Sequence, residues 1–276
     1  MKKFNWFYCL KKIFRLIRIK TSLIAFIITA TISIHRYYDV TNGLVLGLTT
    51  MFTACFGFAI NEYYDHLKDT RMRSEHVIPL GLMSRRQVLI ISCCLFFFSL
   101  TLTIFLYPFQ QLLNIILLFV LSIYSFINNK NGIIANLLVA VCSCLGILIT
   151  LNNFEWTITC YSGITFFLYV LGREIILDIH DYEADRTIGK KSFPISFTIH
   201  TSFFIAILLS ISCILYSVII GIYFVRYGYI LFVCLANVAF LIGLLNYRAK
   251  TEESEYKKFV LVSRVSFLLA IPAFLL

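Results

Sequence analysis

The chain contains 276 residues, of which 60% are hydrophobic and only 14% are charged. A water-soluble globular protein carries about 25% charged residues, so the composition excludes that class and indicates a chain that folds in lipid. The formal net charge of +10 at pH 7 does not indicate a nucleic acid partner, because the basic residues lie between long apolar runs rather than on one polar face. We therefore expect the lipid bilayer as the environment, with no nucleic acid and no obligate protein partner.

Residues 1–20 are basic and contain neither an apolar core nor a small-residue cleavage site, so we expect a cytoplasmic segment and no cleaved signal. The rest of the chain holds apolar stretches of about 17–25 residues, the length of helix that spans the hydrocarbon core of a bilayer. The predicted spans are residues 21–38, 43–60, 87–107, 110–127, 133–151, 158–177, 201–225, 228–246 and 258–276. The sequence thus predicts an all-α integral membrane protein with about nine transmembrane helices, in a single polytopic domain over residues 1–276.

Lysine and arginine are distributed unevenly among the predicted connections. The basic N-terminal segment and the even-numbered connections hold twenty of these residues, whereas the odd-numbered connections hold only Arg36 and Arg226. Short cytoplasmic loops carry the positive excess in membrane proteins, so this distribution predicts a cytoplasmic N-terminus. With nine spans, the C-terminus is then expected on the opposite side of the membrane.

Nine of the fourteen acidic residues fall in two short windows, both on the predicted cytoplasmic side. Each window contains one periodic set of polar residues, which are Asn61, Asp65 and Asp69 in the first and Asp178, Asp181 and Asp185 in the second. The first set is spaced i, i+4 and i+8 and the second i, i+3 and i+7, so each stays on one face of a helix. We expect the two sets to face each other across a central apolar cavity that opens at the cytoplasmic side.

Crowded carboxylates repel one another, so such sets persist only with bound cations or basic partners. Mg²⁺ suits them, because it takes one or two carboxylates and fills its remaining positions with water and substrate phosphates. The two sets are therefore the predicted Mg²⁺ ligands, and their five aspartates are the predicted catalytic residues. Nearby cations are available to bind a diphosphate, and these are Lys68, Arg71, Arg73, Lys130, Arg186, Lys190 and Lys191. With apolar helices to hold a hydrocarbon tail, the pattern predicts ionisation of an allylic prenyl diphosphate.

Two other interpretations account for part of this pattern. A single aspartate in a membrane-protein loop is commonly a solvated charge that contributes to topology, but two periodic sets on the same side favour a site. A cation transporter would place carboxylates in the middle of its spans, whereas these carboxylates cluster at span ends.

The residues of both windows resemble the UbiA-type prenyltransferases, a family of nine-helix membrane enzymes with an N-x-x-x-D-x-x-x-D motif and a D-x-x-D-x-x-x-D motif. Here the motifs read NEYYDHLKD from Asn61 and DIHDYEAD from Asp178. The run GREIILDIHDYEADRTIGKKSFPI over residues 172–195 resembles the family's second signature. A further run, YSFINNKNGIIANLLVA over residues 124–140, resembles a stretch of the family that contacts diphosphate.

The resemblance implies substrate-binding roles for residues that periodicity alone does not single out. Lys130 stands where a diphosphate-contacting lysine is expected, and Tyr124 begins the same stretch. The alternative for this pair is an interfacial aromatic anchor and a lysine that only sets topology. Together with the cations named above, the predicted substrate-binding residues are Asn61, Lys68, Arg71, Arg73, Tyr124, Lys130, Arg173, Arg186 and Lys190.

Within the family, the second signature is most similar to the branch that makes archaeal-type glyceryl ether lipids and to the homogentisate-type enzymes. The resemblance therefore implies Mg²⁺-dependent transfer of a prenyl chain from its diphosphate to a lipophilic acceptor, either an aromatic ring or a glyceryl-type alcohol. A terpene cyclase of the same architecture remains an alternative. The chain departs from the family at HVIPLGL over residues 76–82, where two arginines are missing; either Arg71, Arg73 or Arg85 replaces them or the substrates differ.

Five polar residues near the motifs are not expected to take part in the reaction. Glu62 and Glu183 point off the two helical faces, which predicts a solvent-exposed or salt-bridged role. His66, His76 and His180 lie beside carboxylates in the sequence and are expected to be hydrogen-bonding neighbours.

Overall fold

The computed structural model describes residues 6–71, 76–247 and 253–275, without the side chains of residues 6–9, 67–69 and 71. The described chain is helical, with one isolated β-bridge between Asn131 and Lys191 and no named strand. It divides into two units, residues 1–129 and 130–276.

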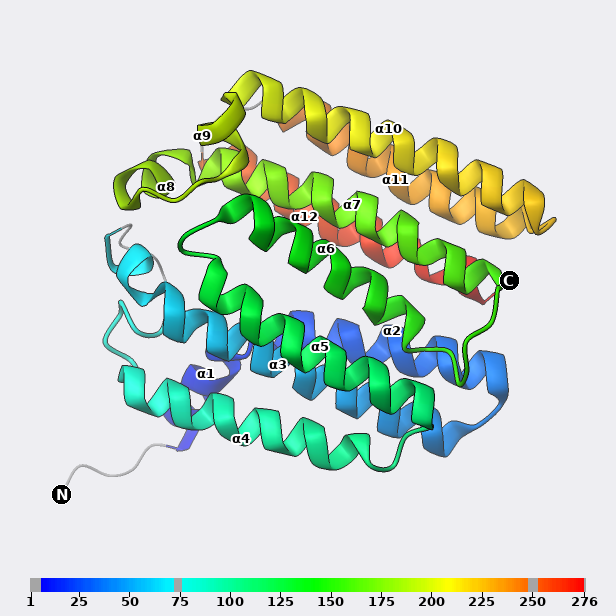
Figure 1. Ribbon diagram of the computed structural model, residues 1–276, viewed down its shortest axis with the longest axis horizontal. Helices are drawn as coiled ribbons and strands as arrows, with labels where there is room; N and C mark the ends of the chain where they lie inside the picture. Colours follow the sequence, from blue (N-terminus) through cyan, green and yellow to red (C-terminus); the bar gives the residue numbers. More distant parts are fainter. Residues whose placement is uncertain (1–5, 72–75, 248–252, 276) are drawn as a thin grey trace. The chain divides into compact units, whose positions relative to one another are not determined.

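The described part of the first unit consists of helices α1 (Trp6–Leu16), α2 (Ile19–Tyr37), α3 (Val40–Arg71), α4 (Arg85–Thr103) and α5 (Pro108–Ile127) (Figure 1). Helix α3 is central in this unit, because it packs against α2, α4 and α5. Polar side chains join three of these helices, since Thr53 Oγ1 on α3 lies 2.7 Å from Ser99 Oγ on α4 and 2.8 Å from Asn114 Oδ1 on α5. Buried hydrogen bonds of this kind hold membrane helices together, because in lipid the hydrophobic effect does not drive one apolar helix against another.

The starts of these helices follow from local sequence signals. Asp39 Oδ1 accepts the backbone N–H of Asn42, which satisfies a free donor in the first turn of α3. Ser84 and Gln87 form a capping box at the start of α4. Pro108 lies in the first turn of α5, where its missing N–H costs no hydrogen bond.

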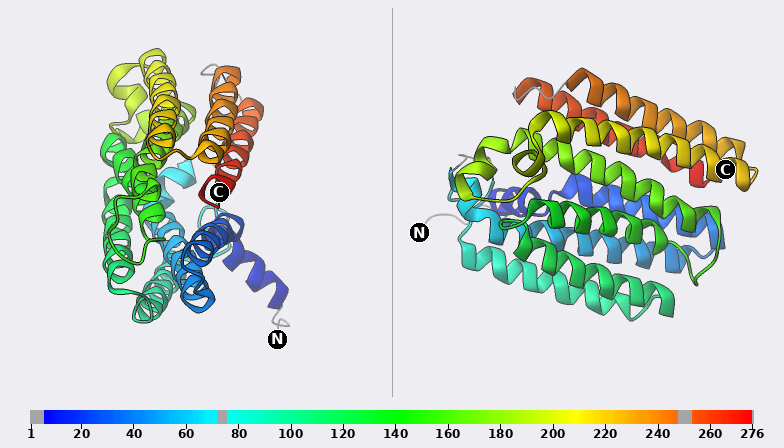
Figure 2. Two further views of the ribbon diagram at one scale, coloured as in Figure 1. Left: turned by 90° about the vertical axis from the view of Figure 1, so that its right-hand side faces the viewer. Right: turned by 45° about the horizontal axis from the view of Figure 1, so that its top comes forward.

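The described part of the second unit consists of α6 (Gly132–Leu148), α7 (Ile158–His180), α8 (Tyr182–Ile188), α9 (Phe193–Phe197), α10 (Ile199–Tyr223), α11 (Tyr227–Tyr247), α12 (Glu253–Leu269) and the 3-10 helix η1 (Ile271–Phe274). Helix α7 packs against α6 and α10, and α11 packs against α10 and α12 (Figure 2). Ile175, Ile176 and Ile179 at the C-terminal end of α7 are fully buried in the core of this unit. This packing fixes the position of Asp178, which lies among them.

Seven described helices are long and apolar enough to cross a membrane, namely α2, residues 40–66 of α3, α4, α5, α7, α10 and α11. Large apolar side chains such as Phe97, Phe119 and Ile219 are 63–65% exposed on these helices, as expected for surfaces that face lipid. The prediction of an all-α, multi-pass membrane protein is therefore confirmed. Each predicted span overlaps a described helix, but α6 and α12 have only 17 residues each, and the count of nine spans stays a prediction.

Candidate functional site

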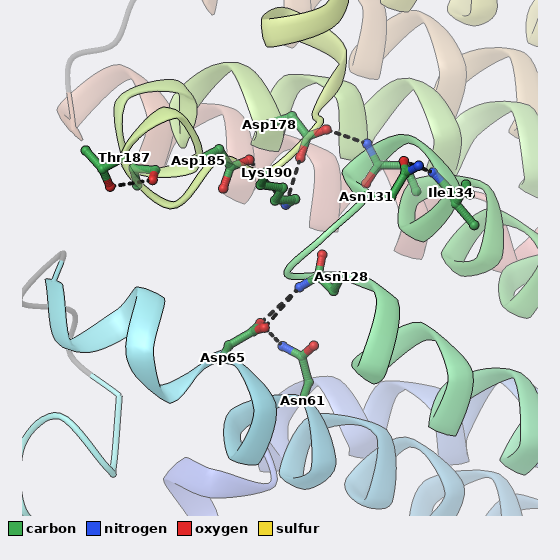
Figure 3. Close-up of polar contacts among 11 residues, drawn as sticks. Asn61, Asp65, Asn128, Asn131, Ile134, Asp178, Asp185, Thr187 and Lys190 are labelled. Atoms are coloured by element: carbon green, nitrogen blue, oxygen red, sulfur yellow. Dashed lines mark hydrogen bonds and ion pairs between the residues drawn. The ribbon is translucent and has the colours of Figure 1, made fainter.

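The first motif lies on α3, which continues as a helix from its apolar part to Arg71. Asn61 and Asp65 share one face, and Asn61 Nδ2 donates to Asp65 Oδ2 at 2.7 Å (Figure 3). Asn128, which follows α5, donates its Nδ2 to Oδ2 and Oδ1 of Asp65 at 3.0 and 3.3 Å. Asp65 is 7% exposed, so two amides orient a buried carboxylate.

One amide oxygen beside this carboxylate has the properties of a metal ligand. Asn61 Oδ1 is buried and, among the described residues, no hydrogen-bond donor reaches it. A buried carbonyl oxygen without a partner is costly, and it is a hard ligand of the kind that Mg²⁺ prefers. Asn61 and Asp65 therefore present the oxygen atoms that the sequence predicts for the metal.

Four predicted residues next to this pair have side chains that are not described. Arg73 lies between residues 71 and 76, and the side chains of Lys68, Asp69 and Arg71 are not described. Their predicted roles stay predictions.

The second motif lies where α7 ends, and the chain bends within it. Asp178 is on α7, Asp181 forms the junction with φ −83° and ψ 5°, and Asp185 is on α8. The predicted single helical face over the three aspartates is therefore interrupted, because α7 ends at His180. Asp178 and Asp185 are 6% and 0% exposed, and Asp181 is half-buried.

Lys190 brings the two buried aspartates together. Its Nζ lies 3.2 Å from Asp185 Oδ2 and 3.6 Å from Asp178 Oδ1, and the lysine is only 4% exposed. Gly189 makes this contact possible, because its φ of +71° ends α8 and turns the chain back. Figure 3 shows the lysine side chain between the two carboxylates.

Among the described side chains, the other predicted cations and Tyr124 lie at the surface or are only partly buried. The side chains of Lys130 and Arg186 are exposed, and Tyr124 is half-buried on α5. Arg173 pairs with its neighbour Glu174. The backbone of Lys130 nevertheless contacts the second motif region, because its carbonyl oxygen accepts the N–H of Lys191 at 3.2 Å.

Two asparagines were missed as site residues. Asn128 holds Asp65 as described above, and Asn136 on α6 donates its Nδ2 to Asp178 Oδ2 at 2.7 Å. Both are nearly fully buried. A signal was available for Asn136, since an asparagine within an apolar run of a membrane helix is costly unless it hydrogen-bonds. Asn128 follows α5 in a polar run and carries no such signal.

Most of the residues that are not expected to take part in the reaction have contacts within the protein. Glu62 is buried and pairs with His76, which agrees with the predicted salt-bridged role, and it also accepts the N–H of Ile78 at 3.3 Å. His66 Nδ1 lies 3.1 Å from the carbonyl oxygen of Tyr63. His180 stacks on the ring of Tyr256 with 3.7 Å between centroids. Glu183 is exposed.

Known proteins are similar to this chain in sequence and in fold. Digeranylgeranylglyceryl phosphate synthase of Methanococcus maripaludis is 30% identical over 85% of this chain and 86% of the relative. A solved structure from a study of digeranylgeranylglyceryl phosphate synthase in membranes matches with a TM-score of 0.73 at 21% identity, over 96% of this chain and 97% of that one. A UbiA homologue from Archaeoglobus fulgidus, described as bound to GPP and Mg²⁺, matches with a TM-score of 0.70 at 17% identity, over 95% and 99% of the two chains.

The two solved structures share the helical fold of this chain. The Archaeoglobus fulgidus homologue holds the metal and the class of diphosphate that the two aspartate sets predict for this chain. The UbiA prenyltransferase family itself matches residues 22–270. The chain therefore belongs to the UbiA prenyltransferase family, as its two motifs predict.

Proposed function

We propose that this chain transfers a prenyl group from an allylic prenyl diphosphate to the hydroxyl group of a glyceryl-type lipid within the membrane. The observation that carries the proposal is the pair of buried carboxylate clusters in a chain of apolar helices. One cluster is built on Asp65 with two amides, and the other on Asp178 and Asp185 with Lys190. Buried carboxylates are costly unless they bind cations, and both clusters belong to family motifs.

Mg²⁺ is the cation that this function requires. The proposed ligands are Asn61, Asp65, Asp69, Asp178, Asp181 and Asp185. When bound, Mg²⁺ supplies positive charge that stabilises the leaving diphosphate. The chain's own contribution is to hold the carboxylates at fixed positions before substrate arrives, through Asn128 at Asp65 and Asn136 at Asp178.

The proposed reaction forms an ether bond. The C1–O bond of the prenyl diphosphate breaks, and its electron pair leaves with the diphosphate. A lone pair of the acceptor hydroxyl then forms the new C–O bond to the allylic carbon, and the hydroxyl proton passes to the released diphosphate. The cations proposed to bind the diphosphate are Lys68, Arg71, Arg73, Lys130, Arg173, Arg186 and Lys190, with Tyr124 beside them.

A glyceryl-type alcohol is favoured over an aromatic acceptor. The support comes from the Methanococcus relative, whose name describes a glyceryl phosphate product. The second signature of this chain also resembles that branch. The lipophilic acceptor and the prenyl tail both partition into the bilayer, so an enzyme of apolar helices meets them where they are concentrated.

The proposal includes a topology. The N-terminus lies in the cytoplasm and the C-terminus on the opposite side, with about nine spans in one domain around an apolar cavity that opens at the cytoplasmic side. The excess of basic residues in the even-numbered connections supports this orientation. No protein partner is required.

The decisive experiment supplies the purified protein with radiolabelled geranyl, farnesyl or geranylgeranyl diphosphate and either a prenylglyceryl phosphate or an aromatic acceptor. We expect an ether-linked lipid with the glyceryl acceptor, complete loss of product in EDTA and recovery with Mg²⁺. A labelled hydrocarbon formed without any acceptor would instead identify a cyclase. Full turnover in EDTA would contradict the metal site.

A further inference from the structure

We propose that Lys190 is a built-in cation that holds Asp178 and Asp185 together in the metal-free protein, yields these carboxylates to Mg²⁺, and then binds the diphosphate. The inference rests on the proposed function, in which the second motif binds Mg²⁺. It adds that metal and diphosphate binding are coupled through one side chain.

The charges and burial of the three residues make the lysine a substitute for a metal ion. Its Nζ lies 3.2 and 3.6 Å from the two carboxylates, and none of the three side chains is more than 8% exposed. Two buried carboxylates repel each other and need a cation between them. An ammonium group supplies one positive charge, which leaves one net negative charge in the cluster for a divalent ion.

The fold provides a place for this lysine. A Cβ atom at Gly132 on α6 would lie 2.6 Å from Lys190 Cε, so glycine leaves the room that the lysine stem occupies. The backbone of Lys190 is fixed on both sides, because its N–H donates to Asp185 O at 3.0 Å and Lys191 pairs with Asn131 in the isolated bridge. A surface lysine that reaches a carboxylate by chance would have neither feature.

Mg²⁺ and the ammonium group compete for the same oxygen atoms. A carboxylate oxygen binds Mg²⁺ at about 2.1 Å and in octahedral geometry, which leaves no space for an ammonium group in the same position. With Mg²⁺ bound, the net charge of the two aspartates, the lysine and the metal changes from one negative to one positive. The displaced ammonium then faces the anion that enters next, and it suits a diphosphate as a mobile point charge with three donors.

This arrangement predicts opposite effects on two affinities. Without the lysine charge, Asp178 and Asp185 bind metal without a competitor, so metal affinity in the absence of diphosphate rises. The diphosphate loses a cation, so its affinity at saturating metal falls. A lysine that only stabilises the fold gives no tighter metal binding, and a lysine that only binds substrate leaves metal affinity unchanged.

The test uses the full-length protein purified in detergent, with Lys190→Gln and Lys190→Met as the variants. Lys257→Gln is the matched control, because this lysine is 72% exposed on α12. Binding of Mn²⁺ alone is followed by the EPR signal of the free ion. Binding of a non-reactive geranylgeranyl thiodiphosphate is followed by calorimetry at saturating Mg²⁺. Size-exclusion chromatography and Tm report folding, and the two Lys190 variants give independent chances of a folded protein.

In both Lys190 variants we expect Mn²⁺ to bind on the order of 10-fold more tightly and the thiodiphosphate on the order of 10-fold more weakly, within the range of ordinary coupling between sites. Lys257→Gln should match the wild type in both. Folded Lys190 variants that bind Mn²⁺ no more tightly than the wild type would overturn the inference.

Asp178→Asn separates this failure from failure of the proposed function. If Asp178→Asn weakens Mn²⁺ binding while the Lys190 variants leave it unchanged, the second motif is a metal site and only the role of the lysine is wrong. If wild-type protein binds Mn²⁺ no better than Asp178→Asn, the second motif is not the metal site. That result would contradict both the proposed function and the inference that rests on it.

Discussion

Asn128 donates one side-chain amide to both carboxylate oxygens of Asp65, at 3.0 Å to Oδ2 and 3.3 Å to Oδ1. Asn61 donates a second amide to Oδ2 at 2.7 Å. Amides orient a carboxylate without cancelling its charge, unlike lysine or arginine. These two amides therefore leave the charge of Asp65 in place, whereas Lys190 balances part of the charge of Asp178 and Asp185.

Removing the side-chain amide of Asn128 should raise the Mg²⁺ concentration that turnover requires. In Asn128→Ala, Asp65 loses a donor that orients it, and a hydrogen bond to a charged group contributes about 1.5–3 kcal/mol. We expect the Mg²⁺ concentration for half-maximal turnover to rise about tenfold or more, because 1.4 kcal/mol corresponds to a factor of ten. Asn129→Ala is the control, since Asn129 donates to the carbonyl oxygen of Tyr64 and not to Asp65. An unchanged Mg²⁺ requirement in Asn128→Ala would show that Asn128 does not position Asp65.

Removing one carboxylate charge should slow the reaction while preserving the fold. Asp178→Asn and Asp65→Asn keep the size of the side chain but reduce the charge available to hold metal, so the leaving diphosphate loses stabilisation. We expect kcat to fall by on the order of 10²-fold, as for the loss of one preorganised electrostatic contact. Glu183→Gln removes a carboxylate that is exposed on α8 and should retain kcat. Tm should change little, because Lys190 keeps Asp185 as its partner in Asp178→Asn. A wild-type kcat in both aspartate variants would show that Asp65 and Asp178 do not contribute to the reaction.

The two ends of α7 should be reached from opposite sides of the membrane. Trp156 is 69% exposed just before this helix, and Glu183 is exposed just after it. In sealed inside-out and right-side-out vesicles, we expect a membrane-impermeant thiol reagent to modify Glu183→Cys only from the cytoplasmic side and Trp156→Cys only from the other side. Reaction of the native cysteines is subtracted with the unmodified chain. Labelling of Glu183→Cys from outside would reverse the proposed orientation.

A hydrogen bond between Tyr107 and Asp39 should make stability depend on pH in a defined window. Tyr107 Oη donates to Asp39 Oδ2 at 3.0 Å. The backbone N–H of Asn42 and the Tyr107 hydroxyl lower the Asp39 pKa from its ordinary value of 3.8. The hydrogen bond to Asp39 and the negative charge of that carboxylate raise the Tyr107 pKa from its ordinary value of 10.0. The bond therefore stabilises the fold between these values, and its contribution is lost as pH falls through the lowered Asp39 pKa or rises through the raised Tyr107 pKa.

The matching measurement compares Tm of the wild type and Tyr107→Phe in detergent across pH. We expect the wild type to be the more stable between about pH 4 and pH 10 and the difference to shrink outside that range. Asp39 and Tyr107 lie near the surface, so the difference should be small and should decrease with salt. A difference that does not depend on pH would mean that packing of the ring, not this hydrogen bond, accounts for it.

The placement of Asn61 and Asp65 on one helical face could be predicted, because it depends on helix geometry alone. Asn61 and Asp65 are four residues apart on a continuous helix, and this spacing brings their side chains together wherever α3 packs. The second motif depends on tertiary structure as well. Periodicity predicts that Asp178 and Asp185 share a helical face, but α7 ends at His180 without a proline or glycine to mark the end. Packing of α7 and α8 decides where the helix stops, and a single sequence does not contain that information.

The partners of the aspartates were harder to predict than the aspartates themselves. The substrate-binding role of Lys190 stays a prediction, but its contacts with Asp178 and Asp185 were not predicted, because they depend on the turn at Gly189 that returns the chain to α7. Asn136 reaches Asp178 from another helix, 42 residues earlier in the chain. Such contacts depend on which helices are neighbours, and the positions of apolar runs do not determine that.

Gly132 and Lys190 restrict each other, and this has an evolutionary consequence. A Cβ atom at position 132 would lie 2.6 Å from Lys190 Cε, whereas its contacts with Cα and Cβ of Ser192, at 3.2 Å, need only a small shift. Replacing the lysine by a shorter residue first would remove the 2.6 Å contact with a Cβ atom at position 132, whereas the reverse order would require the lysine side chain to shift. Homologous chains should therefore show correlated residues at these two positions, with glycine retained wherever a long basic side chain follows the second motif.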